Sequence, residues 1–211
     1  MMETMEFPVR RGNVALKIAR GHFATNHSHI NYYIDITDQK VRLSSAKAVA
    51  KALASQYSGT PVEAILCLDG MGLVGACLAE ALTSSSRSIN DAGNIALVEP
   101  EYSSAGQMIF RDNIQPYIRG KHVLILMASV TTGYTANRGV QTCIYYGGQV
   151  VGVAGIYRAV DKLDEGDYPV HSVYSMEDLP DYESFSYSEC PHCKAGAPID
   201  ALVNSFGYSK F

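Results

Sequence analysis

The sequence has no run of about 18 or more apolar residues, so it predicts no membrane-spanning helix. Its N-terminal stretch also lacks the order of basic, apolar and small residues that marks a secretory signal. There is no excess of positive charge, because 17 Lys and Arg residues stand against 21 Asp and Glu residues, for a formal net charge of -4. A protein that coats nucleic acid normally carries a basic excess, so the composition argues against that function.

Internal repeats and low-complexity tracts are absent as well. The 211 residues are 47% hydrophobic and 18% charged, which is ordinary for a globular protein and excludes wholesale disorder. A chain of this length can bury roughly 70% of its unfolded surface, so we expect one self-sufficient domain, with or without a small appendage.

The five cysteines are odd in number and irregularly spaced. Cys67, Cys77 and Cys143 lie in apolar surroundings, which does not resemble a disulfide framework. We therefore expect free thiols and a reducing, cytoplasmic location.

Short β-rich runs alternate with stretches of helical periodicity along most of the chain. This alternation predicts an α/β fold with a doubly wound, mostly parallel sheet. The predicted strands are Asn31–Thr37, Val62–Leu68, Asn94–Val98, Lys121–Met127, Gln149–Tyr157 and Val170–Tyr174, and the predicted helices are Ser44–Gln56, Gly72–Leu82 and Thr135–Tyr146, with a serine cap on the first.

Three segments follow from this pattern. Residues 31–175 are expected to form the α/β domain, residues 1–30 an N-terminal hood or flank, and residues 176–211 a cysteine-bearing segment packed on the main domain. Ligands of such sheets bind at the carboxyl ends of the strands. The turns of interest are therefore Asp69–Gly72, Glu99–Gly120 and Ala128–Thr135.

The strongest predicted strand runs into the turn Thr131-Thr132-Gly133-Tyr134-Thr135, which precedes a helix. Backbone amides of a glycine-containing turn at a helix N-terminus bind anions, and three threonine hydroxyls add further donors. A phosphate monoester is the natural ligand of such a turn. The alternative is an ordinary connection in which Thr135 only caps the helix.

This turn resembles the 5-phosphoribosyl 1-diphosphate (PRPP) motif of the type I phosphoribosyltransferases. In that family the strand ends in two acidic residues and two apolar residues, followed by Thr-Thr-Gly-x-Thr. The resemblance implies that Thr131, Thr132, Gly133 and Thr135, with the amide of Tyr134, hold the 5′-phosphate of a small phosphorylated ligand. Ser129 adds a hydroxyl where the family usually has an apolar residue.

The resemblance extends over about 130 residues, from Asn31 to Arg158, in the order expected of an orotate phosphoribosyltransferase. It implies a cytoplasmic homodimer that uses Mg²⁺ with PRPP, with orotate as the first candidate base. Glu99–Gly120 corresponds to the family's mobile catalytic loop. The family's diphosphate-binding turn, which often carries an unusual peptide bond, corresponds to Asp69, Gly70, Met71 and Gly72.

Two departures from the family pattern leave two functions open. Met127 and Ala128 replace the acidic pair that holds the ribose hydroxyls, and Glu99 and Glu101 stand where the loop should be basic. Arg111 is the best candidate for a catalytic residue that faces the diphosphate. The chain is either a phosphoribosyltransferase with a rearranged ribose site, or a non-catalytic module that senses a phosphorylated sugar, nucleotide or base. If carboxylates from Asp69, Glu99 or Glu101 enter the ribose site, the enzyme is favoured.

The C-terminal segment contains the C-x₂-C turn Cys190-Pro-His-Cys193. Two thiolates on one turn can share a tetrahedral structural Zn²⁺, for which His22, His27 or His29 could supply the remaining ligands. A redox pair and two uninvolved thiols are the alternatives.

Overall fold

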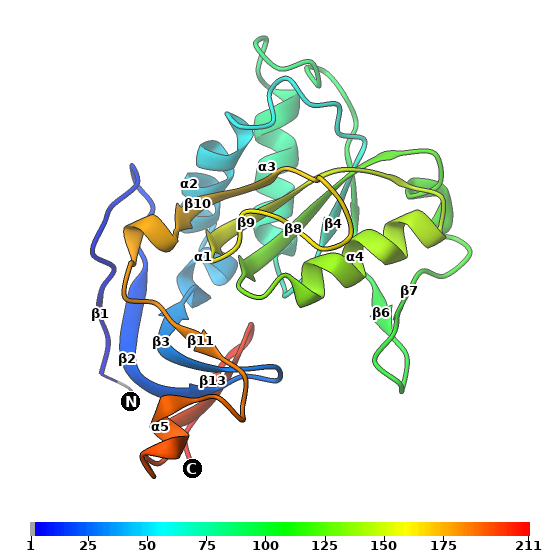
Figure 1. Ribbon diagram of the computed structural model, residues 1–211. Helices are drawn as coiled ribbons and strands as arrows, with labels where there is room; N and C mark the ends of the chain where they lie inside the picture. Colours follow the sequence, from blue (N-terminus) through cyan, green and yellow to red (C-terminus); the bar gives the residue numbers. More distant parts are fainter. Residues whose placement is uncertain (1–2) are drawn as a thin grey trace.

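Five parallel strands form the central sheet of the structure, a computed structural model that describes residues 3–211 (Figure 1). The strand order is β10-β9-β8-β4-β5, and every neighbouring pair is parallel. The direction of winding reverses between β4 and β8. The strands are β4 (Ala64–Cys67), β5 (Ala96–Val98), β8 (His122–Val130), β9 (Gln149–Arg158) and β10 (Val170–Ser175).

Helices cover both faces of this sheet (Figure 1). Alternate residues of β8 serve the two faces, because successive side chains of a strand point to opposite sides. Leu124 and Leu126 belong to the core cluster that contains the helices α2 and α3, whereas Val123 and Ile125 pack with α4. The predicted α/β fold with a doubly wound, mostly parallel sheet is thus confirmed. The helices are α2 (Leu43–Ala54), α3 (Gly72–Thr83) and α4 (Tyr134–Tyr145).

A second, mixed sheet joins the two ends of the chain. Its path is β11-β3-β2-β12-β13, and β1 also pairs with β2. The strand β3 was expected to open the α/β domain but lies here, so this sheet draws on all three predicted segments, whose boundaries stay a prediction. The strands are β1 (Met5–Glu6), β2 (Lys17–Ala24), β3 (His29–Asp35), β11 (Ser184–Phe185), β12 (Ala201–Asn204) and β13 (Gly207–Ser209).

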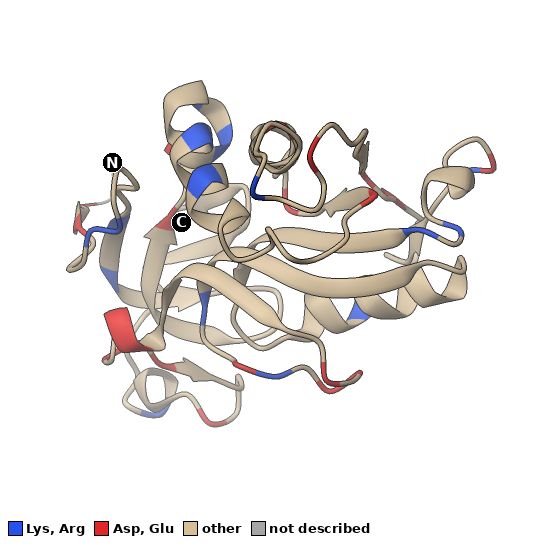
Figure 2. Cartoon of the chain, turned by 90° about the horizontal axis from the view of Figure 1, so that it is seen from above, with Lys and Arg blue, Asp and Glu red and all other residues tan. Residues whose placement is uncertain are grey.

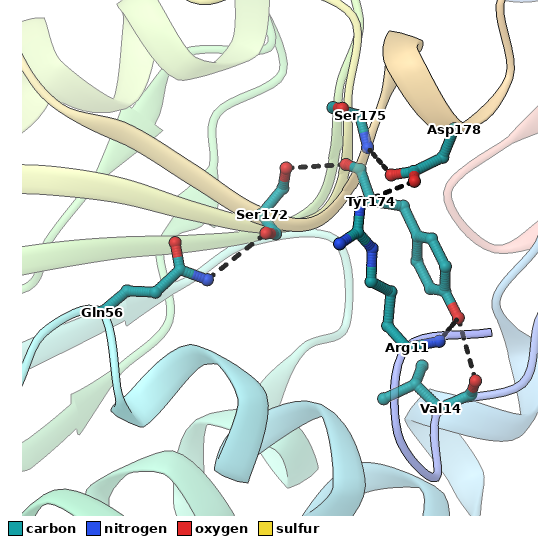
Figure 3. A network of polar contacts seen from close by, with 7 residues as sticks. All are labelled: Arg11, Val14, Gln56, Ser172, Tyr174, Ser175 and Asp178. Carbon is teal, nitrogen blue, oxygen red and sulfur yellow. Dashed lines mark hydrogen bonds and ion pairs between the residues drawn. The ribbon is translucent and has the colours of Figure 1, made fainter. Parts of the chain in front are cut away.

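A polar network fastens the N-terminal segment to the end of β10 (Figure 3). The Tyr174 hydroxyl donates to the Val14 carbonyl over 2.9 Å and accepts from the Arg11 amide over 3.1 Å. The Arg11 guanidinium also pairs with Asp178, 2.6 Å away, on the short 3₁₀ helix η2 (Met176–Asp178). These contacts connect residues 160 to 167 positions apart, and so they hold the mixed sheet against the main domain.

Charge is distributed unevenly between the layers. Lys, Arg, Asp and Glu lie mostly on helices and loops, and the strands of the central sheet are almost free of them (Figure 2). Arg158 is the single Lys, Arg, Asp or Glu within these five strands. No helix within residues 3–211 is long and apolar enough to cross a membrane.

Most predicted elements are observed within two or three residues of their expected bounds, with one correction at a helix start. The helix α2 begins at Leu43, and Arg42 rather than a serine occupies its N-cap.

The segment Glu99–Gly120 contains elements that periodicity did not indicate. They are the hairpin strands β6 (Glu101–Tyr102) and β7 (Met108–Ile109) and the 3₁₀ helix η1 (Gln115–Tyr117). The short helices α1 (Thr37–Val41) and α5 (Pro191–Lys194) were not predicted either.

Glu63 joins the starts of β4 and β8 and provides a test of this pairing. Its carboxylate accepts from the His122 amide (3.0 Å), the His122 ring (2.9 Å) and the Lys121 ammonium (2.9 Å). These donors lower the pKa of Glu63 from 4.5 to about 2. Because the folded-state pKa is depressed, the ionised carboxylate stabilises the fold above about pH 4.5, and this contribution is lost as the pH falls toward 2.

We predict that Glu63→Gln lowers the free energy of unfolding at pH 7 by about 1 kcal/mol, a value reduced because the side chain is 40% exposed. The difference from wild type should vanish in denaturant titrations at low pH. Glu6→Gln is the matched control, since Glu6 forms an exposed pair with Arg10 and should change stability little. Equal stability of the Glu63→Gln variant and the wild type at pH 7 would contradict the assignment.

Candidate functional site

A cavity of about 230 Å³ lies between the carboxyl ends of the parallel strands and the mixed sheet. It is located at the β4–β8 switch point, where doubly wound sheets bind ligands. The central sheet contributes Asp69, Met127, Ser129 and the whole turn from Val130 to Thr135. The opposite wall consists of residues 25–28, parts of β3 and the end of β12, with Tyr157 and Tyr182 between them.

The turn after β8, residues Thr131–Thr135, is called here the threonine turn and lines the cavity along its whole length. Gly133 has φ of +77° and forms the N-cap of α4, which begins at Tyr134. A side chain at Gly133 would be strained by this backbone conformation, which explains the glycine. Thr131, Thr135 and the first residue of α4 therefore line the cavity together, and the Tyr134 amide donates to the Thr132 hydroxyl over 3.4 Å.

The turn after β4 places a carboxylate in the same cavity. Asp69 and Gly70 both adopt left-handed φ values, +56° and +73°, and residues 3–211 contain no cis peptide bond. The Asp69 carboxylate accepts a hydrogen bond from the Ala128 amide over 3.3 Å. Burial raises the pKa of Asp69, while the Ala128 amide and Lys40 oppose the shift.

Gly70, Met71 and Gly72, the other three residues of this turn, do not line the cavity. The Met71 side chain is fully buried in the core. Gly72 begins α3, and a Cβ there would lie 2.7 Å from the Glu99 carboxylate. Glu99 thus occupies the N-terminal end of α3, where a negative charge is favourable.

Met127 and Ala128, at the positions of the missing acidic pair, are almost completely buried. Met127 borders the cavity from the α4 side, and Ala128 contributes its backbone amide to Asp69. A carboxylate therefore reaches this region from the neighbouring strand. Of the three acidic residues considered from the sequence, Asp69 is the one that lines the cavity.

Arg111 does not line the cavity in this structure. Its guanidinium pairs with Glu101 over 2.7 Å across the β6–β7 hairpin, and both side chains are more than half exposed. The assignment of a catalytic role to Arg111 stays a prediction. The pair also means that Glu101 is neutralised locally.

Two basic residues near the site were not found from the sequence. Lys40, on α1, interacts electrostatically with Asp69 and donates a hydrogen bond to the Ser205 carbonyl. Arg138, on α4, lies 5.8 Å from the centre of the Tyr134 ring and donates to the Gly106 carbonyl in the β6–β7 hairpin. Arg138 lies three residues after Thr135 on α4, so both residues lie on one face of the helix. This spacing is the signal that could have identified Arg138. Lys40 has no comparable signal.

Aromatic side chains from both sheets surround the cavity. The ring centres of His27 and Tyr134 lie 4.5 Å apart, and this contact connects the 25–28 loop to the threonine turn. Tyr157 and Tyr182 contact each other at 5.3 Å, and their buried hydroxyls have no hydrogen-bond partner within residues 3–211. Buried hydroxyls normally have partners, so these two groups are unsatisfied in this structure.

A second cluster lies beside the mixed sheet. His22, His29, Cys190 and Cys193 bring four potential ligand atoms within 4.8 Å of one another. The predicted pair Cys190 and Cys193 thus meets two of the three candidate histidines. His27 lies apart from them and lines the cavity. Burial and the neighbouring His22 lower the pKa of His29, which favours the neutral imidazole that binds metals.

Comparison with known proteins gives distant relatives. No family model matches the chain. The orotate phosphoribosyltransferase of Caldicellulosiruptor bescii is 37% identical over 81 residues, which are 38% of this chain and 40% of that relative. The orotate phosphoribosyltransferase of Sulfurimonas denitrificans is 26% identical over 85% of this chain and 89% of its own length. The adenine phosphoribosyltransferase of a Jannaschia species is 28% identical over 60% of this chain and 76% of its own length.

Solved structures share the fold. A phosphoribosyltransferase from Corynebacterium diphtheriae superposes with a TM-score of 0.54 at 20% identity, over 77% of this chain and 90% of its own. The Mycobacterium tuberculosis orotate phosphoribosyltransferase in complex with PRPP gives a TM-score of 0.52 at 16% identity, over 70% and 82%.

The threonine turn generates a prediction for phosphate binding. We expect Thr135→Val to weaken the binding of ribose 5-phosphate roughly tenfold or more, because one hydrogen bond to a charged group is lost. Isothermal titration calorimetry measures the change. Thr142→Val is the control, since the Thr142 hydroxyl donates to the Arg138 carbonyl within α4. Equal affinities of the Thr135→Val variant and the wild type would refute the phosphate assignment.

Proposed function

We propose that the chain is a distant member of the type I phosphoribosyltransferase family, and that it transfers a phosphoribosyl group between PRPP and a nucleobase, with release of diphosphate. Orotate is the first candidate base, because two of the named relatives above are orotate phosphoribosyltransferases. The substrate would be the Mg²⁺ complex of PRPP. The proposal depends chiefly on one observation: the Asp69 carboxylate accepts a hydrogen bond from the Ala128 amide.

Asp69 supplies the negative charge that Met127 and Ala128 cannot. In the family, the acidic pair at these positions holds the ribose hydroxyls and helps to organise Mg²⁺ through the sugar. Hard cations and sugar hydroxyls both require oxygen ligands. The Asp69 carboxylate lines the same cavity as the threonine turn, so one sugar phosphate can contact both. This arrangement favours an enzyme with a rearranged ribose site.

The remaining groups have roles that fit the same substrate. The amides and hydroxyls of Thr131–Thr135 would fix the 5′-phosphate and so set the position of the sugar. Lys40, which neighbours Asp69, and Arg138, which reaches the β6–β7 hairpin, would offset charge on the diphosphate as its bond to the sugar breaks. No protein nucleophile is needed for this transfer.

The base would bind against the aromatic wall. Tyr157 and Tyr182 line this wall, with hydroxyls that have no hydrogen-bond partner within residues 3–211. Tyr33 and Tyr134 also line the cavity and supply ring surfaces for stacking. These residues suit a planar heterocycle but do not distinguish orotate from other bases.

One observation favours the alternative of a binding module without catalysis. The β12–β13 turn approaches the diphosphate turn, because Lys40 donates to the Ser205 carbonyl and the Phe206 ring lies 3.7 Å from a Cβ built on Gly70. A diphosphate would have to compete with this turn. A protein that senses a simpler sugar phosphate would not face that competition.

Calorimetric titration with PRPP, with and without Mg²⁺, followed by a diphosphate-release assay with orotate, adenine and other bases, separates these functions. A transferase binds PRPP in a Mg²⁺-dependent manner and releases diphosphate only when a suitable base is present. Binding without turnover on any base supports the module. No detectable heat at millimolar PRPP excludes the transferase.

We predict that Asp69→Asn reduces Mg²⁺-dependent PRPP affinity roughly tenfold or more, because an amide replaces a charged acceptor. Binding of ribose 5-phosphate should change less, since the threonine turn is intact. Burial raises the pKa of Asp69, so PRPP affinity of the wild type should fall on acidification at a higher pH than for an ordinary aspartate. The Asn variant should lack that fall.

Asp38→Asn serves as the matched control for this prediction. Asp38 lies on α1, the helix that also carries Lys40, but it forms an exposed pair with Arg42. It should therefore leave the affinity and its pH profile unchanged. The same pH profile in the wild type and the Asp69→Asn variant would show that this carboxylate does not act in binding.

A further inference from the structure

We propose that His22, His29, Cys190 and Cys193 bind one structural Zn²⁺, and that this ion holds two walls of the cavity in position. The proposal is independent of the chemistry in the cavity. It starts from the four ligand atoms, which come from β2, β3 and the C-x₂-C turn at the start of α5.

The spacing of the ligand atoms fits a tetrahedral zinc ion. The Zn–N and Zn–S bond lengths of such sites require ligand atoms about 3.3 to 3.8 Å apart. The Nε2 atom of His22 lies 3.1 Å from the Nδ1 atom of His29, 3.4 Å from the Cys190 sulfur and 3.6 Å from the Cys193 sulfur. The Cys193 sulfur lies 3.2 Å from His29 Nδ1. These four distances lie within about 0.2 Å of that range, and all four ligand atoms lie within 4.8 Å of one another.

The surroundings of His22 orient it as a ligand. Its Nδ1 atom lies 3.0 Å from the Pro198 carbonyl and 3.2 Å from the Ala197 carbonyl. Carbonyl oxygens only accept, so Nδ1 carries the proton and the Nε2 lone pair points to the cluster. Histidines that bind zinc normally donate their other ring N–H to such a partner.

A β-bulge in β2 places His22 in the cluster. The register between β2 and β3 shifts between Arg20 and Phe23. The His22 amide donates to the Asp200 carboxylate over 2.8 Å, and a Cβ at Gly21 would lie 2.6 Å from that carboxylate. Glycine is therefore required beside the ligand. Bulges commonly redirect a side chain toward a functional site.

The position of His192 excludes it from the set of zinc ligands. His192 lies inside the C-x₂-C turn but stacks on the His22 ring at 5.1 Å instead of joining the four atoms. The two cysteines are free thiols in the structure, and three of the four ligands are buried. One buried thiol and two buried imidazoles gathered around the second thiol match a closed structural site better than an accessible redox pair.

The ion would connect two walls of the cavity. The loop 25–28, which lines the cavity and brings His27 to Tyr134, joins the strands that carry His22 and His29. The strand β12 pairs with β2 next to His22, in register Ala201 with Phe23, and ends at the cavity residues Asn204 and Ser205. Loss of the ion would release both walls while the central sheet stays folded.

The test uses the full-length protein purified under reducing conditions. We expect about one zinc per chain by elemental analysis, and Co²⁺ exchanged into the chelator-treated protein should show the visible bands of a tetrahedral thiolate site. Cys193→Ser should weaken zinc binding at least tenfold, and this exposed position makes misfolding a minor concern. His192→Ala, in the same turn, should retain the metal.

Hydrogen exchange of the wild type with and without chelator tests whether the ion holds the two walls of the cavity in position. Amides of residues 25–28 and 201–204 should exchange faster after zinc removal, and those of α3 should not change. No zinc together with no tetrahedral Co²⁺ spectrum, or a Cys190–Cys193 disulfide in the purified protein, would overturn the site. Unchanged exchange in both walls would overturn its structural role. Neither readout requires PRPP, so failure here is distinct from failure of the transferase proposal.

Discussion

The parallel pairing of β4 with β8 is the interaction on which the candidate site depends. Beyond the last residue of β4, the Leu68 amide still donates to the Leu126 carbonyl over 2.8 Å, so the turn after β4 begins beside the final residues of β8, which ends at Val130. Their following turns supply Asp69 and the threonine turn. If this register moved by one residue, the alternation of side chains would reverse, and the apolar residues of β8 would face the wrong helices. Core packing and site geometry are therefore fixed by the same hydrogen bonds.

The central sheet was predictable because its signals are local. The runs around Ile65 and Ile125 are apolar on both faces, and the small residues of α3 follow at helical spacing. The threonine turn was equally readable, since Gly133 and its neighbours form a contiguous motif. The mixed sheet was not predictable in this way, because β2 and β12 recognise each other across most of the chain and neither has a distinctive pattern. The 25–28 loop, which connects β2 and β3, lines the cavity through that sheet and was missed for the same reason.

The cavity illustrates how a chemical group can be supplied from a different strand. The two positions after the apolar part of β8 carry no charge, yet a carboxylate hydrogen-bonds to the Ala128 backbone from the adjacent turn. A motif search that requires both acidic residues in one stretch misses such a substitution, because it tests the order of residues and not their positions in space. The spatial test needs the strand register, which the apolar pattern alone does not define. The cluster of His22, His29 and the two cysteines is a similar case, since its ligands come from distant segments.

The connection between the chain ends has a consequence for biosynthesis. The His22 amide and its partner Asp200 are separated by 178 positions. Since chains grow from the N-terminus at about 5–20 residues per second, β2 must wait roughly 10 to 35 seconds for β12 to be made. During that time the α/β core can already form, whereas one edge of β2 has no strand beside it near His22 and offers unpaired backbone groups to other chains. The protein therefore finishes its cavity last, and the interval before completion is the period in which nascent chains are most exposed to aggregation.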